Sequence, residues 1–198
     1  MRVGGVSITL EEMAQNAKKH FKTITAHRHE VMKNCFRAGI GWQGLIHDLS
    51  KYSPEEFLQG VLHYQGTRSP NEGERELYGY SKAWLHHKGR NKHHYEYWND
   101  YSKVTKQLEP VKMPTRYFVE MICDRIAASK IYMGENYTDA SALEYYNGKR
   151  QGAKVLIHPD TDAHLKWTLE LLADKGEART FRYLRKLIRR DRLKHFYL

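Results

Sequence analysis

Residues 42–52 read WQGLIHDLSKY, and His47 and Asp48 stand side by side in this stretch. Imidazole and carboxylate groups are both ligands of divalent metal ions. An apolar run leads into the pair, so we expect it at the core-facing end of a short helix, about Trp42 to Leu49. The stretch therefore makes His47-Asp48 a candidate metal site, and the rest of the chain shows what surrounds it.

The segment before this stretch predicts a long helix with one histidine on its inner face. Thr9 and Glu12 form a capping box, and Gly39 can take the left-handed conformation that ends a helix at about residue 38. Apolar residues recur at helical spacing around His27, so its side chain should point into the core. His29 lies about 200° further round the helix and should point elsewhere.

The segments after the pair predict further helices and no strand of useful length. The predicted helices cover residues 54–64, 74–87, 93–104, 115–133, 138–147, 160–175 and 177–193. The chain is therefore expected to be all-α and to form a single helical domain over residues 1–198. The core of the metal site should lie at about 20–135, with the C-terminal helices at 138–198.

Composition narrows the class of protein. The 198 residues carry a formal net charge of +10, which attracts anions such as nucleotides, phosphoesters or nucleic acid. The two cysteines lie far apart in apolar helical contexts, which fits a reducing cytoplasm. No stretch approaches the ~18 apolar residues of a membrane span, so we expect a cytoplasmic protein without a membrane partner.

Residues 179–194 are strongly basic, with Asp191 as the one acidic residue. The segment is either the solvated face of a terminal helix or a contact for nucleic acid or an acidic partner. No zinc finger, helix-turn-helix or aromatic–basic repeat favours the nucleic-acid interpretation, so the solvated face is preferred.

Asp124 is the second carboxylate of interest, because it lies in the apolar stretch VEMICDRIA at residues 119–127. A buried carboxylate is costly unless it has a partner. An arginine, such as the adjacent Arg125, and a divalent cation are the two alternatives, and the residue by itself leaves both open.

The order His27, then His47-Asp48, then Asp124 resembles the HD-domain superfamily of metal-dependent phosphohydrolases, which are all-helical and have the ligand order H…HD…D. Lys51 follows the aspartate by three residues, as in the common form of that motif. The stretches 42–57, 83–88 and 91–94 also resemble a family of uncharacterised bacterial and phage proteins. That closer resemblance covers most of residues 20–135 and implies no function of its own.

The superfamily resemblance implies that His27, His47, Asp48 and Asp124 bind a metal ion. Members with extra histidines between the HD pair and the last aspartate bind two ions, and four histidines lie between residues 86 and 94 here. Helical phase favours His87 and His94 as ligands, with Asp48 bridging the ions. Two alternatives stay open for the pairs His86/His87 and His93/His94. One member of a pair can form only a hydrogen bond to a ligand or a tyrosine, and His86 or His93 can be the ligand in place of its neighbour. The mixed donors suit Mn, Fe, Co, Ni, Zn or Mg.

The resemblance further implies hydrolysis of a nucleotide or another small phosphoester by a metal-activated water. Asp48 and Lys51 are the expected catalytic residues, Lys51 as a cation for a phosphate oxygen. The expected substrate-binding or ligand-supporting residues are His86, His93, Arg90 and Arg125. Two alternatives remain: a di-iron oxygenase, since some members combine six such ligands with oxygen chemistry, and a nucleotide-sensing module with a basic C-terminal helix.

Overall fold

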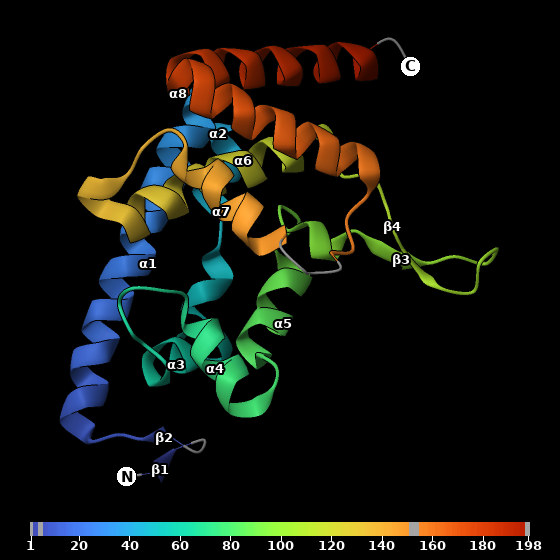
Figure 1. Ribbon diagram of the computed structural model, residues 1–198. Coiled ribbons are helices and arrows are strands. Elements are labelled where there is room, and N and C mark those ends of the chain that lie inside the picture. The colour runs from blue at the N-terminus through green and yellow to red at the C-terminus, as the bar shows by residue number, and fades with distance from the viewer. Residues whose placement is uncertain (1, 4–5, 151–154, 197–198) are drawn as a thin grey trace. The chain divides into compact units, whose positions relative to one another are not determined.

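The computed structural model describes residues 2–3, 6–150 and 155–196, and it confirms the all-α prediction (Figure 1). The described residues form eight α-helices and two short antiparallel hairpins. The strands are β1 (Arg2–Val3) with β2 (Val6–Ser7), and β3 (Asn99–Tyr101) with β4 (Leu108–Pro110). The described residues divide into two compact units. The first unit comprises residues 1–29 and 48–91, and the second comprises 30–47 and 92–198.

The first helix, α1 (Leu10–Ala38), begins and ends where the sequence predicts. The backbone N–H of Glu12 donates to Thr9 Oγ1 (3.1 Å), and Glu12 Oε2 accepts from the N–H of Thr9 (2.8 Å), which is the reciprocal capping box. Gly39 follows the helix with φ +86°, a conformation that costs glycine little. Residues 10–29 of α1 belong to the first unit and residues 30–38 to the second.

The first unit also contains η1 (Leu49–Tyr52), α3 (Pro54–Leu62), α4 (Pro70–Tyr78) and α5 (Lys82–Arg90), and α3 packs against the other three. The prediction of one helix over residues 74–87 is wrong, because two separate helices occupy this region. Gly79 ends α4 with φ +77°. Ser81 Oγ then accepts from the N–H of Trp84 and starts α5 (2.9 Å).

The second unit is built around α6 (Thr115–Met133), which has the predicted bounds. It also contains α2 (Gly41–Ile46), η2 (Tyr95–Tyr97), η3 (Gly134–Asn136), α7 (Ser141–Arg150) and α8 (Pro159–Phe196). The helices α6, α7 and α8 pack against one another. Fully buried core residues include Ile122, Ile126, Leu165, Leu169, Leu172 and Leu184. Gly176 (φ 74°, ψ 171°) bends α8 into two arms, at the predicted break (Figure 1).

The predicted helix over residues 93–104 is absent from the structure. This segment instead forms η2 and then β3, whose hairpin partner is β4 (Figure 1). The carbonyl of Trp98 accepts from the N–H of Val111 (2.8 Å), and its indole donates to the carbonyl of Lys92 (2.7 Å). These contacts with residues outside the segment replace the i→i−4 pattern of a helix, so local periodicity misled the prediction.

The short helix before the histidine–aspartate pair also differs from the prediction. α2 ends at Ile46, so His47 and Asp48 lie in the connection to η1 and not on a helix. The apolar residues that led into the pair are largely exposed, and Trp42 is 76% exposed. The pair itself is buried, as expected: His47 is 2% and Asp48 is 1% exposed.

Candidate metal centre

Asp48 occupies an unusual backbone position between α2 and η1. Its φ of 53° and ψ of 27° place it in the left-handed region, which aspartate tolerates better than most residues. The N–H of Lys51 donates to the carbonyl of Asp48 (3.0 Å) and begins the following turn. Asp48 is thus held at a sharp change of chain direction with its carboxylate buried.

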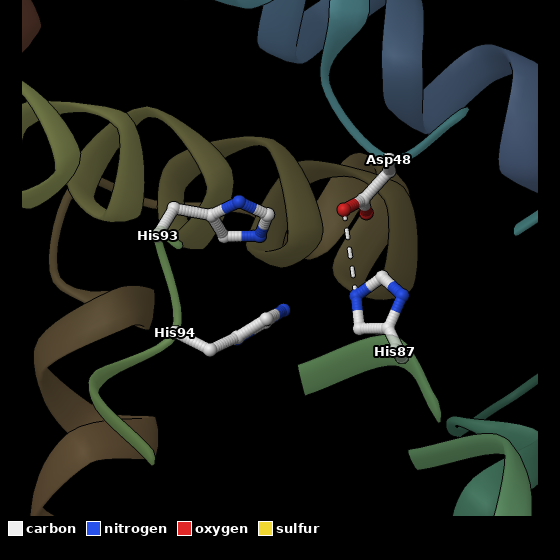
Figure 2. Close-up of side chains that lie close together, drawn as sticks. All are labelled: Asp48, His87, His93 and His94. Carbon is white, nitrogen blue, oxygen red and sulfur yellow. Dashed lines mark ion pairs between the residues drawn. The ribbon is translucent and has the colours of Figure 1, made fainter. Parts of the chain in front are cut away.

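Three side chains of the first unit surround the Asp48 carboxylate. Nε2 of His27 lies 3.9 Å from Oδ2, and Nζ of Lys51 lies 2.7 Å from the same oxygen. Nε2 of His87 lies 3.4 Å from Oδ1, and Figure 2 shows this ring facing the carboxylate. These four residues, His27, Asp48, Lys51 and His87, are called the Asp48 cluster below. The structure brings together the first-unit residues that the sequence singled out as ligands.

A second carboxylate fixes the histidines of α5. Nδ1 of His87 donates to Oε2 of Glu56 (2.7 Å), and Nδ1 of His86 donates to Oε1 (2.7 Å). Burial raises the pKa of Glu56, but the hydrogen bonds from His87 and His86 outweigh it, so the pKa is lowered overall. Glu56 is therefore an ionised acceptor that sets the orientation of both rings.

The second unit repeats this arrangement around His47. Nδ1 of His47 donates to Oε1 of Glu120 (2.9 Å), and Nε2 of His47 lies 3.6 Å from Oδ1 of Asp124. Nδ1 of His93 is 3.3 Å from Oε1 of Glu120, and the amide of Gln43 donates to Oε2 (2.6 Å). Burial raises the pKa of Glu120, but the hydrogen bonds from His47 and His93 bring it down to about 2. These five residues form the His47 cluster.

Both clusters place a histidine between a glutamate and an aspartate. The glutamate accepts from Nδ1, so the neutral ring presents the lone pair of Nε2 to the aspartate. A lone pair and a carboxylate oxygen 3.4–3.6 Å apart repel each other unless a proton or a cation lies between them. Metal-binding histidines commonly donate their other N–H to a carboxylate in this way. Both clusters therefore have the donor chemistry of a divalent metal site.

The remaining predicted residues differ in how they are placed. His93 is buried and His94 is half-buried, and their rings lie 4.1 Å apart (Figure 2). Arg90 is exposed at the end of α5, where Nη1 donates to the carbonyl of His86 (3.5 Å). Arg125 is half-buried next to Asp124 on α6. His29 is exposed, as predicted from its position on the helix.

Sequence reasoning missed Glu56, Glu120 and Gln43. Glu120 precedes Asp124 by four residues on α6, so one helix face carries both carboxylates, and this spacing is a signal that could have identified it. Glu56 gives no comparable signal, because its partner His87 lies 31 residues away in the sequence. Gln43 is likewise 77 residues from Glu120.

The second unit also contains a cavity of about 740 Å³ beside α2. It is lined by Gly39, Ile40, Gly41, Trp42, Gln43, Pro114, Arg116, Ile188, Asp191 and Arg192. A cavity of this volume is in the range that holds small ligands. Gln43 both lines the cavity and donates to Glu120, so the cavity wall and the His47 cluster share this residue.

The fold and the two clusters define an all-helical protein with a candidate metal centre made of histidines and carboxylates. The chain belongs to the family described as a family of unknown function (DUF5662), whose family model matches residues 16–171. No curated protein and no solved structure matches the chain. Among the described residues, no helix is both long and apolar enough to cross a membrane.

Proposed function

We propose that this protein is a metal-dependent phosphohydrolase that acts on a nucleotide or another small phosphoester. The observation that carries the proposal is the repeated glutamate–histidine–aspartate arrangement, found once in each unit. The proposed ligands are the six residues His27, His47, Asp48, His87, His94 and Asp124. Their order along the chain, with Lys51 three residues after Asp48, resembles the HD-domain superfamily and supports this reaction class.

The donor set supports one or two divalent ions. The Asp48 cluster offers two imidazoles and a carboxylate, and the His47 cluster offers imidazoles with the carboxylate of Asp124. Mixed nitrogen and oxygen donors favour Mn, Fe, Co, Ni, Zn or Mg over calcium, which prefers oxygen alone. Glu56 and Glu120 orient His87 and His47 so that Nε2 is the nitrogen presented.

The protein's own side chains fit hydrolysis of an anion. A divalent ion bound here would lower the pKa of its water ligand toward ~7 and so supply hydroxide at neutral pH. Lys51 holds its ammonium 2.7 Å from Asp48, and its side chain is 28% exposed, so the group borders both the cluster and solvent. A cation in that position can bind a phosphate oxygen and stabilise the charge that develops on it.

Elemental analysis of the purified protein, followed by a screen of nucleotides and generic phosphoesters with added metals, tests the proposal. We expect one or two ions per chain and metal-dependent release of phosphate or a phosphorylated product. Asp48→Asn should lose both, while His29→Ala, which changes an exposed histidine on the same helix as His27, should lose neither.

Other outcomes of this experiment overturn the proposal. Two tightly bound irons with visible absorption, without phosphoester turnover, would identify the oxygenase alternative. Nucleotide binding without turnover by the metal-loaded protein would identify a sensing module. Wild-type protein that binds no ion from any of the six metals would remove the basis of the site itself.

A further inference from the structure

The distal arm of α8, the part of the helix after Gly176, has a charge that the proposed hydrolase does not use. Eight cations lie in this arm, with Asp191 as the one acidic residue between 179 and 194. The cations are Arg179, Arg182, Arg185, Lys186, Arg189, Arg190, Arg192 and Lys194. Such a density of like charge destabilises an isolated helix. We therefore ask which of these cations have structural contacts and which face solvent.

Two of the eight cations have a structural role at the end of α1. Nε and Nη2 of Arg185 donate to the carbonyl of Arg37 (2.9 and 2.6 Å). Nη2 of Arg192 donates to the carbonyl of Gly39 (2.9 Å). The last carbonyls of a helix have no partner within the helix, and cations there are favoured by the helix dipole. These two arginines therefore stabilise the second unit.

The other six cations share one face of the arm. At 100° per residue, Arg179, Arg182, Lys186, Arg189, Arg190 and Lys194 fall within an arc of about 140°. Between residues 179 and 194 they extend over roughly 22 Å at 1.5 Å per residue. All six are exposed, and Asp191 lies outside this arc. We call these six residues the basic face.

The environment of the arm decides which partner fits. Its apolar side, with Phe181, Leu184 and Ile188, is buried in the core of the second unit and cannot insert into a lipid bilayer. Leu193, 56% exposed, is the one large apolar side chain exposed among the described residues from 177 to 194. A protein interface needs an apolar centre, which this face lacks. A polyanion is the partner that remains.

We propose that the basic face binds the phosphate backbone of a nucleic-acid duplex without reading its sequence. Four of the six cations are arginines, whose planar guanidinium groups match phosphate oxygens. Binding of single strands relies on aromatic platforms. The half-buried Tyr183 offers none, because its hydroxyl hydrogen-bonds His164 (2.6 Å) and Trp167 packs against its ring. This inference does not depend on the proposed hydrolase.

Salt dependence of binding to a fluorescent DNA duplex of mixed sequence, about 20 base pairs long, tests the proposal. Each phosphate contact adds about 0.9 to the slope of log affinity against log salt. Replacing Arg182, Lys186 and Arg189 together by glutamine should reduce the slope by about 2–3 and weaken binding roughly 10-fold or more near 0.1 M salt. Thermal melts should show that this variant remains folded.

The matched control removes the same charge elsewhere. Lys18, Lys19 and Lys22 are exposed cations on α1, and glutamine at all three should leave the slope unchanged. Asp48→Asn should also bind the duplex normally, which separates this test from that of the hydrolase. Equal losses in the two triple variants would mean that only net charge matters and would overturn the proposal. So would a wild-type protein that ignores the duplex, or one that prefers vesicles of anionic phospholipid or single-stranded oligothymidine.

Discussion

At the scale of single residues, the candidate centre shows which roles a sequence can reveal. His27, His47, Asp48 and Asp124 stand out because a polar side chain on an apolar face needs a partner and because their order resembles a known motif. Glu56 and Glu120 act through contacts with histidines 31 and 73 residues away. The four-residue spacing from Asp124 hints at Glu120, but no local pattern shows that either glutamate pairs with a histidine, so their orienting role emerges only from the fold.

Replacing Glu56 by glutamine should weaken metal binding without unfolding the protein. Glutamine has nearly the same shape but no charge, so it holds His87 and His86 less firmly than the carboxylate does. Loss of such an orienting carboxylate typically lowers metal affinity about 10–100-fold. Competition with a coloured chelator measures the affinity. Glu55→Gln, an exposed neighbour on the same helix, is the control, and equal affinities for both variants and the wild type would contradict this role of Glu56.

At the scale of elements, local chemistry predicted where helices begin and end better than it predicted which segments are helical. The capping box at Thr9, the left-handed conformation of Gly39 and the helix break at residue 176 are predicted correctly, because each depends on residues within a few positions. The hairpin after residue 98 was missed, because the backbone partner of Trp98 comes from Val111. Tertiary hydrogen bonds there override helical periodicity, as they commonly do for short segments.

The bend in α8 should depend on glycine at position 176. Its φ of 74° with ψ of 171° is a region that glycine alone occupies readily, and a Cβ there would lie 3.0 Å from Oδ2 of Asp139. Gly176→Ala should therefore reduce the free energy of unfolding by about 1–3 kcal/mol, measured by urea denaturation. Gly148→Ala is the matched control, because it lies in α7 with open space around it and should stabilise the protein by up to ~1 kcal/mol. The same sign for both variants would contradict this account.

An ion-pair network joins α1, α6 and the distal arm of α8 through Glu177. Its carboxylate pairs with Arg37 and with Nζ of Lys130 (2.6 Å), and it accepts from the hydroxyl of Tyr137 (3.2 Å). Burial raises the pKa of Glu177, but the hydrogen bonds and charges of Lys130 and Arg37 lower it overall. A carboxyl whose pKa is lower in the folded state stabilises the protein above its unfolded pKa, and this contribution is lost as pH falls through the folded value.

Glu177→Gln should consequently destabilise the protein in a pH-dependent way. At pH 7 we expect a loss of about 1–2 kcal/mol in the free energy of unfolding, since the partners are partly exposed. The difference from the wild type should shrink as the pH falls below about 4.3, the ordinary pKa of a glutamate in the unfolded chain, and on through the lower pKa of the folded state. Urea denaturation across this range measures it. Glu170→Gln, which removes an exposed ion pair with Lys166, should change the free energy of unfolding little at any pH. A difference for Glu177→Gln that does not change with pH would refute the role of its charge.

At the scale of the whole molecule, the sequence predicted the fold class but gave no sign of the two units. The chain passes from one unit to the other after residues 29, 47 and 91. The first two of these points lie within two residues of proposed ligands, His27 and the His47-Asp48 pair. Packing between segments that are distant in sequence decides to which unit a residue belongs. Hydrophobic periodicity gives no information about such packing. Each unit contains candidate ligands, His27, Asp48 and His87 in the first and His47, His94 and Asp124 in the second, so metal binding should affect the stability of both units.

Added metal should therefore raise the melting temperature of the protein. A ligand that binds only the folded state stabilises it by about 2.7 kcal/mol at 100 times its Kd. For a chain of this length that corresponds to a rise of roughly 5–10 °C. Melting the metal-free protein with increasing Mn or Zn measures the effect, and Asp48→Asn and Asp124→Asn should each reduce it because each cluster loses its carboxylate ligand. His29→Ala should keep the full rise. If both aspartate variants kept it as well, the metal would bind elsewhere, and the two glutamate–histidine–aspartate arrangements would be buried ion-pair networks held together by protons alone.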